Sequence, residues 1–281
     1  MIIEIGKFLI YTILIVLLSK ILLAKALRGI AENLKLKPRI IGSITGIATS
    51  IPEFLTVTVS CFKGLTSTSL YNIFGSNVIN FIQYIVSILI NKNHKEIKNK
   101  AIIIQLGIAI FTIFMPIFLL EYDENINIYF VILFMILYFL FSWIIKNIHE
   151  KYLKGYEEKI EKNQMIKETK KEHNHKKTYV YFLLIIIAGI LLYIIGDALG
   201  NVLKRLSETY GIAESILGIL LGVITSIPEF ITFFESQKYY KQEKERKILG
   251  VIEATNNLLV SNMLNLFIIQ SIGIMINYIK H

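Results

Sequence analysis

The sequence TSIPEF occurs twice in this chain, at residues 49–54 and again at residues 225–230. The similarity extends without gaps over GSITGIATSIPEFLTVTVS at residues 42–60 and GILLGVITSIPEFITFFES at residues 218–236. An uninterrupted identity over TSIPEF is not expected by chance. The chain therefore contains an internal repeat, and this repeat decides its fold.

A second pair of similar segments follows the two copies. They read NIFGSNVIN at residues 72–80 and NLLVSNMLN at residues 257–265. The identical pairs between them are all polar: Asn72/Asn257, Ser76/Ser261, Asn77/Asn262 and Asn80/Asn265. The repeat therefore preserves side-chain chemistry and not only a helical pattern.

The composition of the whole chain is that of a membrane protein. Of its 281 residues, 54% are hydrophobic and 18% are charged, whereas a soluble globular domain has about 25% charged residues. This composition, with a mean hydropathy of +0.58, argues against a cytosolic enzyme and excludes a disordered chain. The formal net charge of +9 does not indicate nucleic acid, because the basic residues lie in short connectors between apolar runs.

Eight apolar stretches are long enough to cross a bilayer about 30 Å thick. They fall at about residues 6–26, 39–62, 68–90, 101–120, 128–148, 178–203, 214–236 and 249–275. The first is too long for a signal-peptide core and lacks a small-residue cleavage site, so we expect it to remain as a span. The sequence thus predicts an all-α integral membrane protein with a first repeat of five spans at residues 1–148, a basic loop at residues 149–177, and a second, shortened repeat of three spans at residues 178–281.

The distribution of lysine and arginine predicts the orientation in the membrane. The connectors after the odd-numbered spans, with the adjoining span ends, hold 24 of the 30 Lys and Arg residues, and the opposite side holds 5. Because basic residues accumulate on the cytoplasmic side, we expect these connectors in the cytoplasm and both termini outside the cell membrane. The second TSIPEF copy lies five spans after the first, an odd number, so the two copies cross in opposite directions. Such inverted repeats are typical of secondary transporters, whose substrate site lies at the midplane.

Each TSIPEF helix is expected to present one polar face and to break at its proline. Small and polar residues recur at spacings of three and four, which place them on one helix face. In the first copy they are Gly42, Gly46, Thr49, Glu53, Thr56 and Ser60. Pro52 and Pro228 lack an N–H group, so the carbonyl groups four residues earlier lose their intrahelical partners. Inside a bilayer, such carbonyls are tolerated only where protein, water or an ion satisfies them.

A carboxylate follows each proline near the middle of its span, at Glu53 and Glu229. A charge at the bilayer centre costs about 2.5–3.5 kcal/mol on the insertion scale, and such residues are functional by default. The oxygens expected around the two carboxylates come from Thr49, Thr225, Ser76, Asn80, Ser261 and Asn265. Two carboxylates and neutral oxygens form a set with a formal charge of −2, and Ca²⁺ prefers about six to eight oxygen ligands. The sequence therefore predicts a site for a small hard cation.

Structural interpretations stand beside these functional ones. The glycines at four-residue spacing indicate close helix packing, and serine and asparagine often join membrane helices by hydrogen bonds. For the glutamates, the alternative is a protonated pair hydrogen-bonded across an interface, but their duplication beside prolines favours a functional site. Asp197 is expected at an interface or in packing. Glu253 is interpreted either as part of a cation-attracting cytoplasmic mouth or as a solvated helix start.

The motifs resemble those of the sodium/calcium exchanger family of cation/Ca²⁺ antiporters. That family has two inverted repeats, each with a G-T-S-x-P-E helix followed by a G-N-x-x-G-S-N-x-x-N or -D helix. Here TSIPEF is intact twice, and the second helices read YNIFGSNVIN and NNLLVSNMLN. The resemblance implies an antiporter that exchanges Ca²⁺ or a related divalent cation for Na⁺ or H⁺, with these ions as substrates and no cofactor. It also implies alternating access through a sliding pair of helices, spans 1 and 6.

The resemblance also implies a role for each matching residue. Glu53 and Glu229 would be the central ligands of Ca²⁺ and Na⁺, and Thr49 and Thr225 would add oxygens to them. The remaining positions would be Ser50, Ser226, Ser76 and Ser261 at the flanking Na⁺ sites and Asn80 and Asn265 at the middle site.

Some features depart from the family pattern. Ala48, Ile224 and Val260 stand where the family has glycine, and Asn265 stands where some members have aspartate. The second half has three spans, whereas family members usually have five per repeat. These departures motivate an alternative function as a non-transporting membrane cation sensor or an assembly subunit.

Other classes of function fit less well. A channel needs weak binding, whereas an ion held by two buried carboxylates would leave slowly. Catalysis is not expected, because no nucleophile, zinc cluster or intramembrane histidine accompanies the glutamates. The expected partners are inorganic cations and the lipid bilayer, without nucleic acid, and the sequence leaves open whether the chain forms a homodimer.

Overall fold

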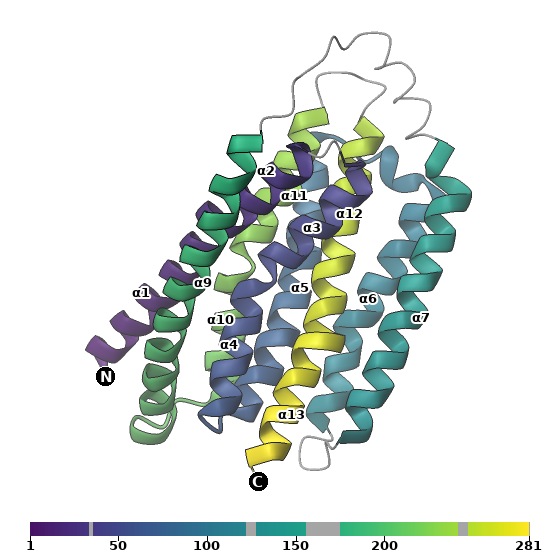
Figure 1. Cartoon of the computed structure of the whole chain (residues 1–281). Helices are drawn as coiled ribbons and strands as arrows, with labels where there is room; N and C mark the ends of the chain where they lie inside the picture. The colour runs from purple at the N-terminus through teal and green to yellow at the C-terminus, as the bar shows by residue number, and fades with distance from the viewer. Residues whose placement is uncertain (34–35, 122–127, 156–174, 241–246, 281) are drawn as a thin grey trace.

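The computed structural model describes residues 1–33, 36–121, 128–155, 175–240 and 247–280, and within these ranges every regular element is a helix. The helices lie side by side in one bundle (Figure 1). In chain order they are α1 (Ile2–Leu18), η1 (Ser19–Ala24), α2 (Lys25–Asn33), α3 (Pro38–Thr49), α4 (Ile51–Phe62), α5 (Thr66–Asn91), η2 (Glu96–Lys98), α6 (Lys100–Glu121), α7 (Ile128–Tyr152), α9 (His175–Lys204), η4 (Arg205–Thr209), α10 (Glu214–Thr225), α11 (Ile227–Tyr239), α12 (Lys247–Met263), η7 (Leu264–Ile269) and α13 (Gln270–Lys280). Residues 156–174 of the expected basic loop lie outside the described residues.

Eight helical stretches in the described chain are long and apolar enough to cross a membrane, which confirms the number expected from the sequence. They are Ile2–Leu27, Arg39–Phe62, Thr66–Asn91, Lys100–Phe118, Tyr129–Tyr152, Tyr179–Thr209, Glu214–Tyr239 and Lys247–Ile279. Several spans comprise two or three consecutive helices, because short breaks or π-helical turns interrupt them. The chain is therefore an all-α integral membrane protein.

The two TSIPEF spans run in opposite directions, as the odd number of spans between them predicts. In Figure 1, α3 leads downward into α4, whereas α10 leads upward into α11. Both spans break within the motif: α3 ends at Thr49 and α4 begins at Ile51, while α10 ends at Thr225 and α11 begins at Ile227. In each case, the proline is in the first two positions of the new helix, where its missing N–H group leaves no bond unmade.

The second-motif helices are α5, which carries NIFGSNVIN, and α12, which carries most of NLLVSNMLN. Glycines allow each broken span to approach the second-motif helix of the other repeat. A β-carbon on Gly46 of α3 would lie 2.9 Å from the carbonyl oxygen of Asn257 on α12. A β-carbon on Gly222 of α10 would lie 2.6 Å from the carbonyl oxygen of Asn72 on α5. Because these contacts are with backbone atoms, no side chain fits there, and the packing interpretation of the glycines is confirmed. The two repeats are thus interlocked at their centre.

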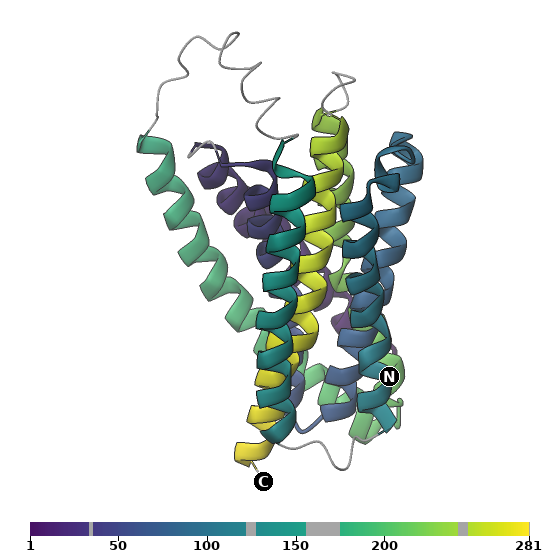
Figure 2. The same cartoon turned by 90° about the vertical axis from the view of Figure 1, so that its right-hand side faces the viewer.

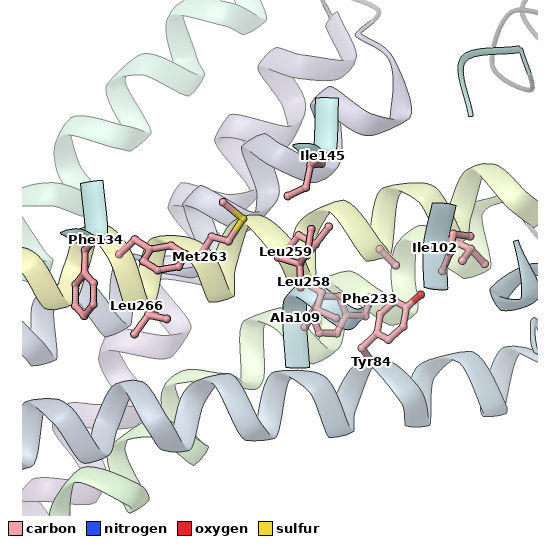
Figure 3. Close-up of a cluster of buried hydrophobic side chains, with 14 of the residues drawn as sticks. Tyr84, Ile102, Ala109, Phe134, Ile145, Phe233, Leu258, Leu259, Met263 and Leu266 are labelled. Atoms are coloured by element: carbon pink, nitrogen blue, oxygen red, sulfur yellow. The ribbon is translucent and has the colours of Figure 1, made fainter. Parts of the chain in front are cut away.

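The remaining helices cover this central group from two sides. In Figure 1, α1 and α9 lie on one side of α3, α4, α10 and α11, and α6 and α7 lie on the other. Figure 2 shows that α9 leans away from the other helices toward its N-terminal end. The largest buried apolar cluster joins α5, α6, α7, α11, α12, η7 and α13, and its labelled members in Figure 3 include Tyr84, Phe134, Phe233 and Met263. This apolar cluster holds the second-motif helices firmly in place.

Two acidic residues outside the motifs take different positions. Asp197 on α9 has a largely exposed side chain and forms an ion pair with Lys63 Nζ at 3.3 Å, which fits the interfacial position expected for it. Glu253 on α12 is 1% exposed. Its interpretation as a solvated helix start is therefore wrong, because α12 packs along α3 over this turn and excludes water from it.

Candidate functional site

The two glutamates lie in the first turn of α4 and of α11, directly after the break in each span. Both side chains are completely buried, at 0% exposure. The serine of each motif forms the junction between the two helical halves, Ser50 in the first repeat and Ser226 in the second. The break therefore places a carboxylate, a hydroxyl group and two helix ends at the same level of each span.

The Glu53 carboxylate receives hydroxyl groups from both repeats. Its Oε1 atom accepts hydrogen bonds from Ser76 Oγ at 3.3 Å and from Ser226 Oγ at 3.4 Å. The side chain of Thr225, also in the second repeat, interacts with the same carboxylate. Hydroxyl groups of the second TSIPEF copy therefore complete the environment of the carboxylate in the first copy.

The Glu229 carboxylate has a corresponding environment. Its Oε1 atom accepts a hydrogen bond from Ser261 Oγ at 3.1 Å, and Ser261 Oγ lies 2.9 Å from Ser50 Oγ of the first repeat. Thr49 interacts with the Glu229 carboxylate, as Thr225 does with Glu53. The two carboxylates are close enough to each other to interact electrostatically. The inverted helices thus bring their acidic residues to one place.

Four oxygens of this group are buried and accept no hydrogen bond. They are Glu53 Oε2, Glu229 Oε2, Asn80 Oδ1 and Asn265 Oδ1. A buried oxygen without a partner costs about 1–3 kcal/mol, and more when it is charged. The other oxygen of each carboxylate is bonded, Glu53 Oε1 to Ser76 and Ser226 and Glu229 Oε1 to Ser261. These four atoms form two repeat-related pairs, and their residue types suit a hard cation.

Asn77 and Asn262, for which the sequence analysis predicted no role, hold the side-chain amides of Asn265 and Asn80 in position. Asn77 Oδ1 accepts from Asn265 Nδ2 at 3.2 Å, and Asn262 Oδ1 accepts from Asn80 Nδ2 at 3.1 Å. Asn77 and Asn262 each also donate to the backbone carbonyl of the other, both at 3.3 Å. This arrangement binds the NH₂ groups of Asn80 and Asn265 and leaves their carbonyl oxygens free. The signal was present in the sequence, because Asn77 and Asn262 are an identical pair of the repeat.

A second pair of bonds ties each TSIPEF helix to the second-motif helix of its own repeat. Asn72 Nδ2 donates to Thr56 Oγ1 at 2.6 Å, and Asn257 Nδ2 donates to Thr232 Oγ1 at the same distance. The inverted repeat thus reproduces this contact in detail. These bonds orient the helices that carry the glutamates and do not involve the glutamates themselves.

The structure brings together all ten residues predicted for the site. Eight are joined through the contacts of Glu53 and Glu229 described above, and Asn80 Nδ2 also donates to Ser261 Oγ at 3.3 Å. Asn265 is joined through Asn77, which contacts Asn262. Among the described residues, no group of three or more histidine, cysteine or acidic side chains is placed to hold a metal ion, and this site has two carboxylates. The chemistry of the group is two carboxylates with hydroxyl and amide oxygens, which favours cations such as Ca²⁺ or Na⁺ over softer transition metals. That these residues hold a cation stays a prediction.

Comparisons with known proteins agree with this architecture. The family model described as "Sodium/calcium exchanger protein" matches residues 3–146 and 180–281, which include both repeats. Solved structures of the sodium-calcium exchanger NCX_Mj have the same fold. One, soaked with 10 mM Na⁺ and zero Ca²⁺, has a TM-score of 0.51 and 19% identity, with 98% of this chain and 83% of that chain covered. Another, soaked with 2.5 mM Na⁺ and 0.1 mM Ca²⁺, has a TM-score of 0.50 at 19% identity and the same coverage.

No curated protein sequence matches the chain. The family model nevertheless matches well over half of the residues, and it matches them on both sides of the loop that separates the repeats. The matched ranges contain every residue of the candidate site. This chain belongs to the sodium/calcium exchanger family.

Proposed function

We propose that the chain is a secondary active cation antiporter that exchanges Ca²⁺, or a related divalent cation, for Na⁺ or H⁺. The observation that carries this proposal is the group of four unbonded oxygens, two charged and two neutral, contributed equally by the inverted repeats. A divalent cation between Glu53 and Glu229 would satisfy these oxygens and neutralise both charges. The same ligands would serve two monovalent ions in its place, so the two kinds of substrate would compete.

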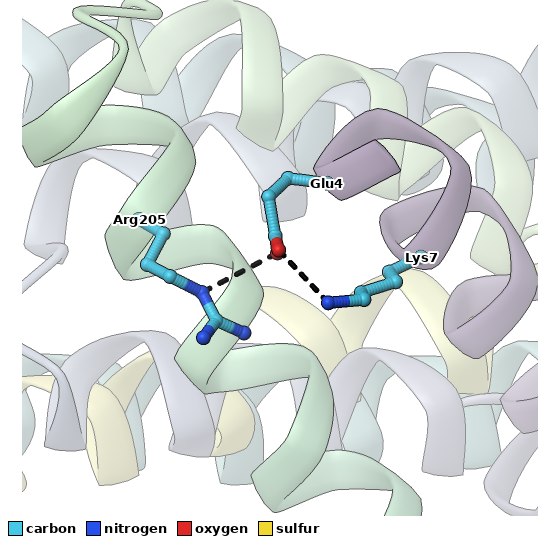
Figure 4. A network of polar contacts seen from close by, with 3 residues as sticks. All are labelled: Glu4, Lys7 and Arg205. Atoms are coloured by element: carbon cyan, nitrogen blue, oxygen red, sulfur yellow. Dashed lines mark hydrogen bonds and ion pairs between the residues drawn. The ribbon is translucent and has the colours of Figure 1, made fainter. Parts of the chain in front are cut away.

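Alternating access supplies the transport step in this proposal. Spans 1 and 6, formed by α1 and by α9 with η4, pack against each other on one side of the site. Glu4 on α1 accepts a hydrogen bond from Lys7 Nζ at 2.9 Å and forms an ion pair with Arg205 Nε at 3.3 Å (Figure 4). This contact supports a pair of helices that slides as a unit past the interlocked centre.

The proposed orientation follows the distribution of basic residues. With an even number of spans, both termini lie on one side of the membrane, and the positive-inside rule places them outside the cell. Residues 1–148 and 178–281 would then act as the two repeats, with residues 149–177 between them in the cytoplasm. Neither repeat would bind a cation by itself, because each supplies only one of the two carboxylates.

Flux measurements with the purified chain in proteoliposomes test this function. We expect an outward Na⁺ gradient or a pH gradient to drive Ca²⁺ uptake. Glu53→Gln and Glu229→Gln should each abolish it, whereas Glu235→Gln, on the exposed face of α11, should retain it. Uptake that is unchanged in the first two variants would exclude this site, and wild-type liposomes without coupled flux would exclude the antiporter.

The alternative is a membrane cation sensor or an assembly subunit. The observation in its favour is Val260, which replaces a family glycine and packs where α3 approaches α12, 3.1 Å from a β-carbon placed on Gly46. A bulkier side chain at this crossing would restrain the helices from changing their relative positions. Thermal stabilisation by Ca²⁺ without any coupled flux would support the sensor and contradict the antiporter.

A further inference from the structure

Glu253 is a buried acidic residue that the proposed ion site does not use. It lies in the interior of α12, is 1% exposed, and precedes Ser261 of the site by eight residues, which corresponds to about 12 Å along the helix. A carboxylate inside a membrane span is costly and is functional by default. Under the proposed orientation, the N-terminal end of α12 faces the cytoplasm, so Glu253 lies between the cytoplasm and the site.

Two hydrogen bonds define the face of α12 on which Glu253 lies. Asn256 Nδ2 donates to the backbone carbonyl of Arg39 on α3 at 2.7 Å, and Asn257 Nδ2 donates to Thr232 Oγ1 on α11 at 2.6 Å. Successive residues of a helix are about 100° apart, which places Glu253 about 60° from Asn256 and about 40° from Asn257, between the two. The Glu253 side chain therefore leaves α12 between α3 and α11.

The seam between α3 and α11, along the surface of α12, leads from Glu253 to the central site. Both helices pack against α12. At Gly42, α3 passes so close to α12 that a β-carbon would meet the backbone carbonyl of Glu253. From there α3 continues to Thr49, which interacts with the Glu229 carboxylate in the first turn of α11. The seam thus joins Glu253 to one of the two central carboxylates.

An amide oxygen lies on the same seam, between Glu253 and the site. Asn257 is one helical turn from Glu253 on one side and one turn from Ser261 on the other, and it is 2% exposed. Its Oδ1 atom is buried and accepts no hydrogen bond. Such an oxygen costs about 1–3 kcal/mol when it is left unbonded, and it is of the type that hard cations bind. Oxygen atoms therefore follow one another along α12 toward Glu229.

The first repeat does not have this arrangement. Thr68 and Asn72 occupy the equivalent positions on α5. Asn72 Oδ1 accepts a hydrogen bond from Ser76 Oγ at 3.5 Å. The Glu214 carboxylate binds the backbone N–H of Thr68 at 2.9 Å and its Oγ1 at 3.2 Å, and it thereby satisfies the first turn of α5. The acidic residue at the outer end thus has a structural role, whereas Glu253 stands inside its helix beside an unbonded amide oxygen.

The other charged residues of α3 and α12 lie at the cytoplasmic ends of these helices. They are Arg39, preceded by Lys37, and Lys247. Residues 40–49 of α3 carry no charged side chain, and residues 248–263 of α12 carry only that of Glu253. A cation that has passed the basic residues therefore meets Glu253 before it reaches the central site.

We propose that Glu253 and Asn257 Oδ1 form a staging site, at which a cation stops on its way between the cytoplasm and the central site. This proposal rests on the proposed function and names an access residue for it. One carboxylate and one amide oxygen are fewer than the roughly six to eight oxygens that hold Ca²⁺ tightly, so water completes the shell and the ion moves on. A negative charge in a passage with low-dielectric walls raises the local concentration of cations.

The apparent Ca²⁺ affinity, measured separately at the two faces of the membrane, tests the proposal. Ca²⁺ enters everted membrane vesicles from the cytoplasmic face and right-side-out vesicles from the outer face. We expect Glu253→Gln to raise the half-saturating Ca²⁺ concentration about tenfold in everted vesicles and to leave it unchanged in right-side-out vesicles. Glu253→Asp, which keeps the charge, should stay near the wild type. Glu235→Gln, which removes an exposed carboxylate from α11 at the same end, should match the wild type in both.

The outcomes separate the staging site from the function beneath it. A half-saturating concentration in Glu253→Gln that is unchanged at the cytoplasmic face, or raised equally at both faces, overturns the staging site and leaves the antiporter standing. A change confined to the outer face overturns the assignment of Glu253 to the cytoplasmic route. Absence of any coupled flux in the wild type overturns the antiporter itself.

Cysteine labelling tests the same route without Glu253→Gln. Cys61 is the single cysteine of the chain and is buried, so Cys61→Ser provides a background without thiols. In that background, Glu253→Cys should react during exchange with a membrane-impermeant cationic methanethiosulfonate added at the cytoplasmic face. Leu258→Cys, in the apolar cluster on another face of α12, should not react. A Glu253→Cys protein that transports Ca²⁺ but does not react from the cytoplasmic face would overturn the proposal.

Discussion

Ser226, in the second copy of TSIPEF, donates a hydrogen bond to the carboxylate of Glu53 in the first copy, with 3.4 Å between Oγ and Oε1. The reciprocal contact runs through Ser50, whose Oγ lies 2.9 Å from Ser261 Oγ, the donor to Glu229. Each half of the chain thus completes the environment of the other half's acidic residue. A duplicated motif becomes one site because the two copies cross the membrane in opposite directions.

Removing the hydroxyl groups bonded to Glu53 should weaken cation binding without abolishing it. We expect Ser76→Ala and Ser226→Ala each to lower the apparent Ca²⁺ affinity about 2- to 10-fold, since each loses one hydrogen bond worth about 0.5–1.5 kcal/mol. Both donate to Glu53 Oε1, so the double variant should be non-additive. Concentration dependence of Ca²⁺ flux measures this, with Ser271→Ala on α13 as a buried control. Additive losses would show that the hydroxyl groups act separately.

Asn77 should affect the affinity for the cation, although it is not itself a predicted ligand. Asn77→Ala removes the acceptor of Asn265 Nδ2, so the free carbonyl oxygen of Asn265 is no longer held in position. Loss of such a supporting contact typically costs about 10- to 100-fold in metal affinity. Asn91→Ala, which removes a buried asparagine from the C-terminal end of the same helix, should leave the affinity unchanged. Equal losses in the two variants would indicate a general packing defect in α5.

The interlocked glycines should be sensitive to a single methyl group. Gly222→Ala places a β-carbon 2.6 Å from the Asn72 carbonyl oxygen and 2.7 Å from the Ser76 nitrogen, so the helices must separate. We expect a destabilisation of about 1–3 kcal/mol, typical of overpacking. The thermal unfolding midpoint in detergent measures it. Gly189→Ala on α9 is the control, because its β-carbon would meet nothing within 4 Å. A Gly222→Ala midpoint equal to that of the control would contradict the close approach.

Cation binding should raise the thermal stability of the folded chain. At a Ca²⁺ concentration about 100 times the dissociation constant, the expected gain is about 2.7 kcal/mol. Mg²⁺ should stabilise less at equal concentration, because it gives up its bound waters reluctantly and demands octahedral geometry. The gain should vanish in the double variant Glu53→Gln/Glu229→Gln. Persistence of Ca²⁺ stabilisation in that variant would locate the binding elsewhere in the molecule.

Much of the fold could be predicted from local sequence features. The number of spans follows from apolar length, and the inversion of the repeats follows from counting the spans between the two TSIPEF copies. The break in each span follows from a proline, whose missing N–H group acts on its own helix alone. The polar face of the TSIPEF helix was also predictable, because helical periodicity relates residues three and four apart.

The burial of Glu253 and the roles of Asn77 and Asn262 could not be predicted in the same way. Glu253 is surrounded because α12 packs against α3, a contact between residues far apart in the sequence. Asn77 and Asn262 gain their roles from each other, through mutual bonds between α5 and α12. Helical periodicity places a side chain on a face, but it does not say which other helix that face will meet.

The sequence by itself determined the membrane class, the eight spans, the opposed directions of the repeats and the two carboxylates, since all of these depend on composition and on order along the chain. Only the tertiary structure decided that Glu53 is bonded by Ser226, and that Asn80 and Asn265 keep unbonded carbonyl oxygens. The physical reason is that hydrophobicity and helix formation act locally, whereas hydrogen-bond partners within a bundle depend on how closely the helices approach. Here the glycines set that approach, and they bring the second-motif helix of each repeat against the broken span of the other.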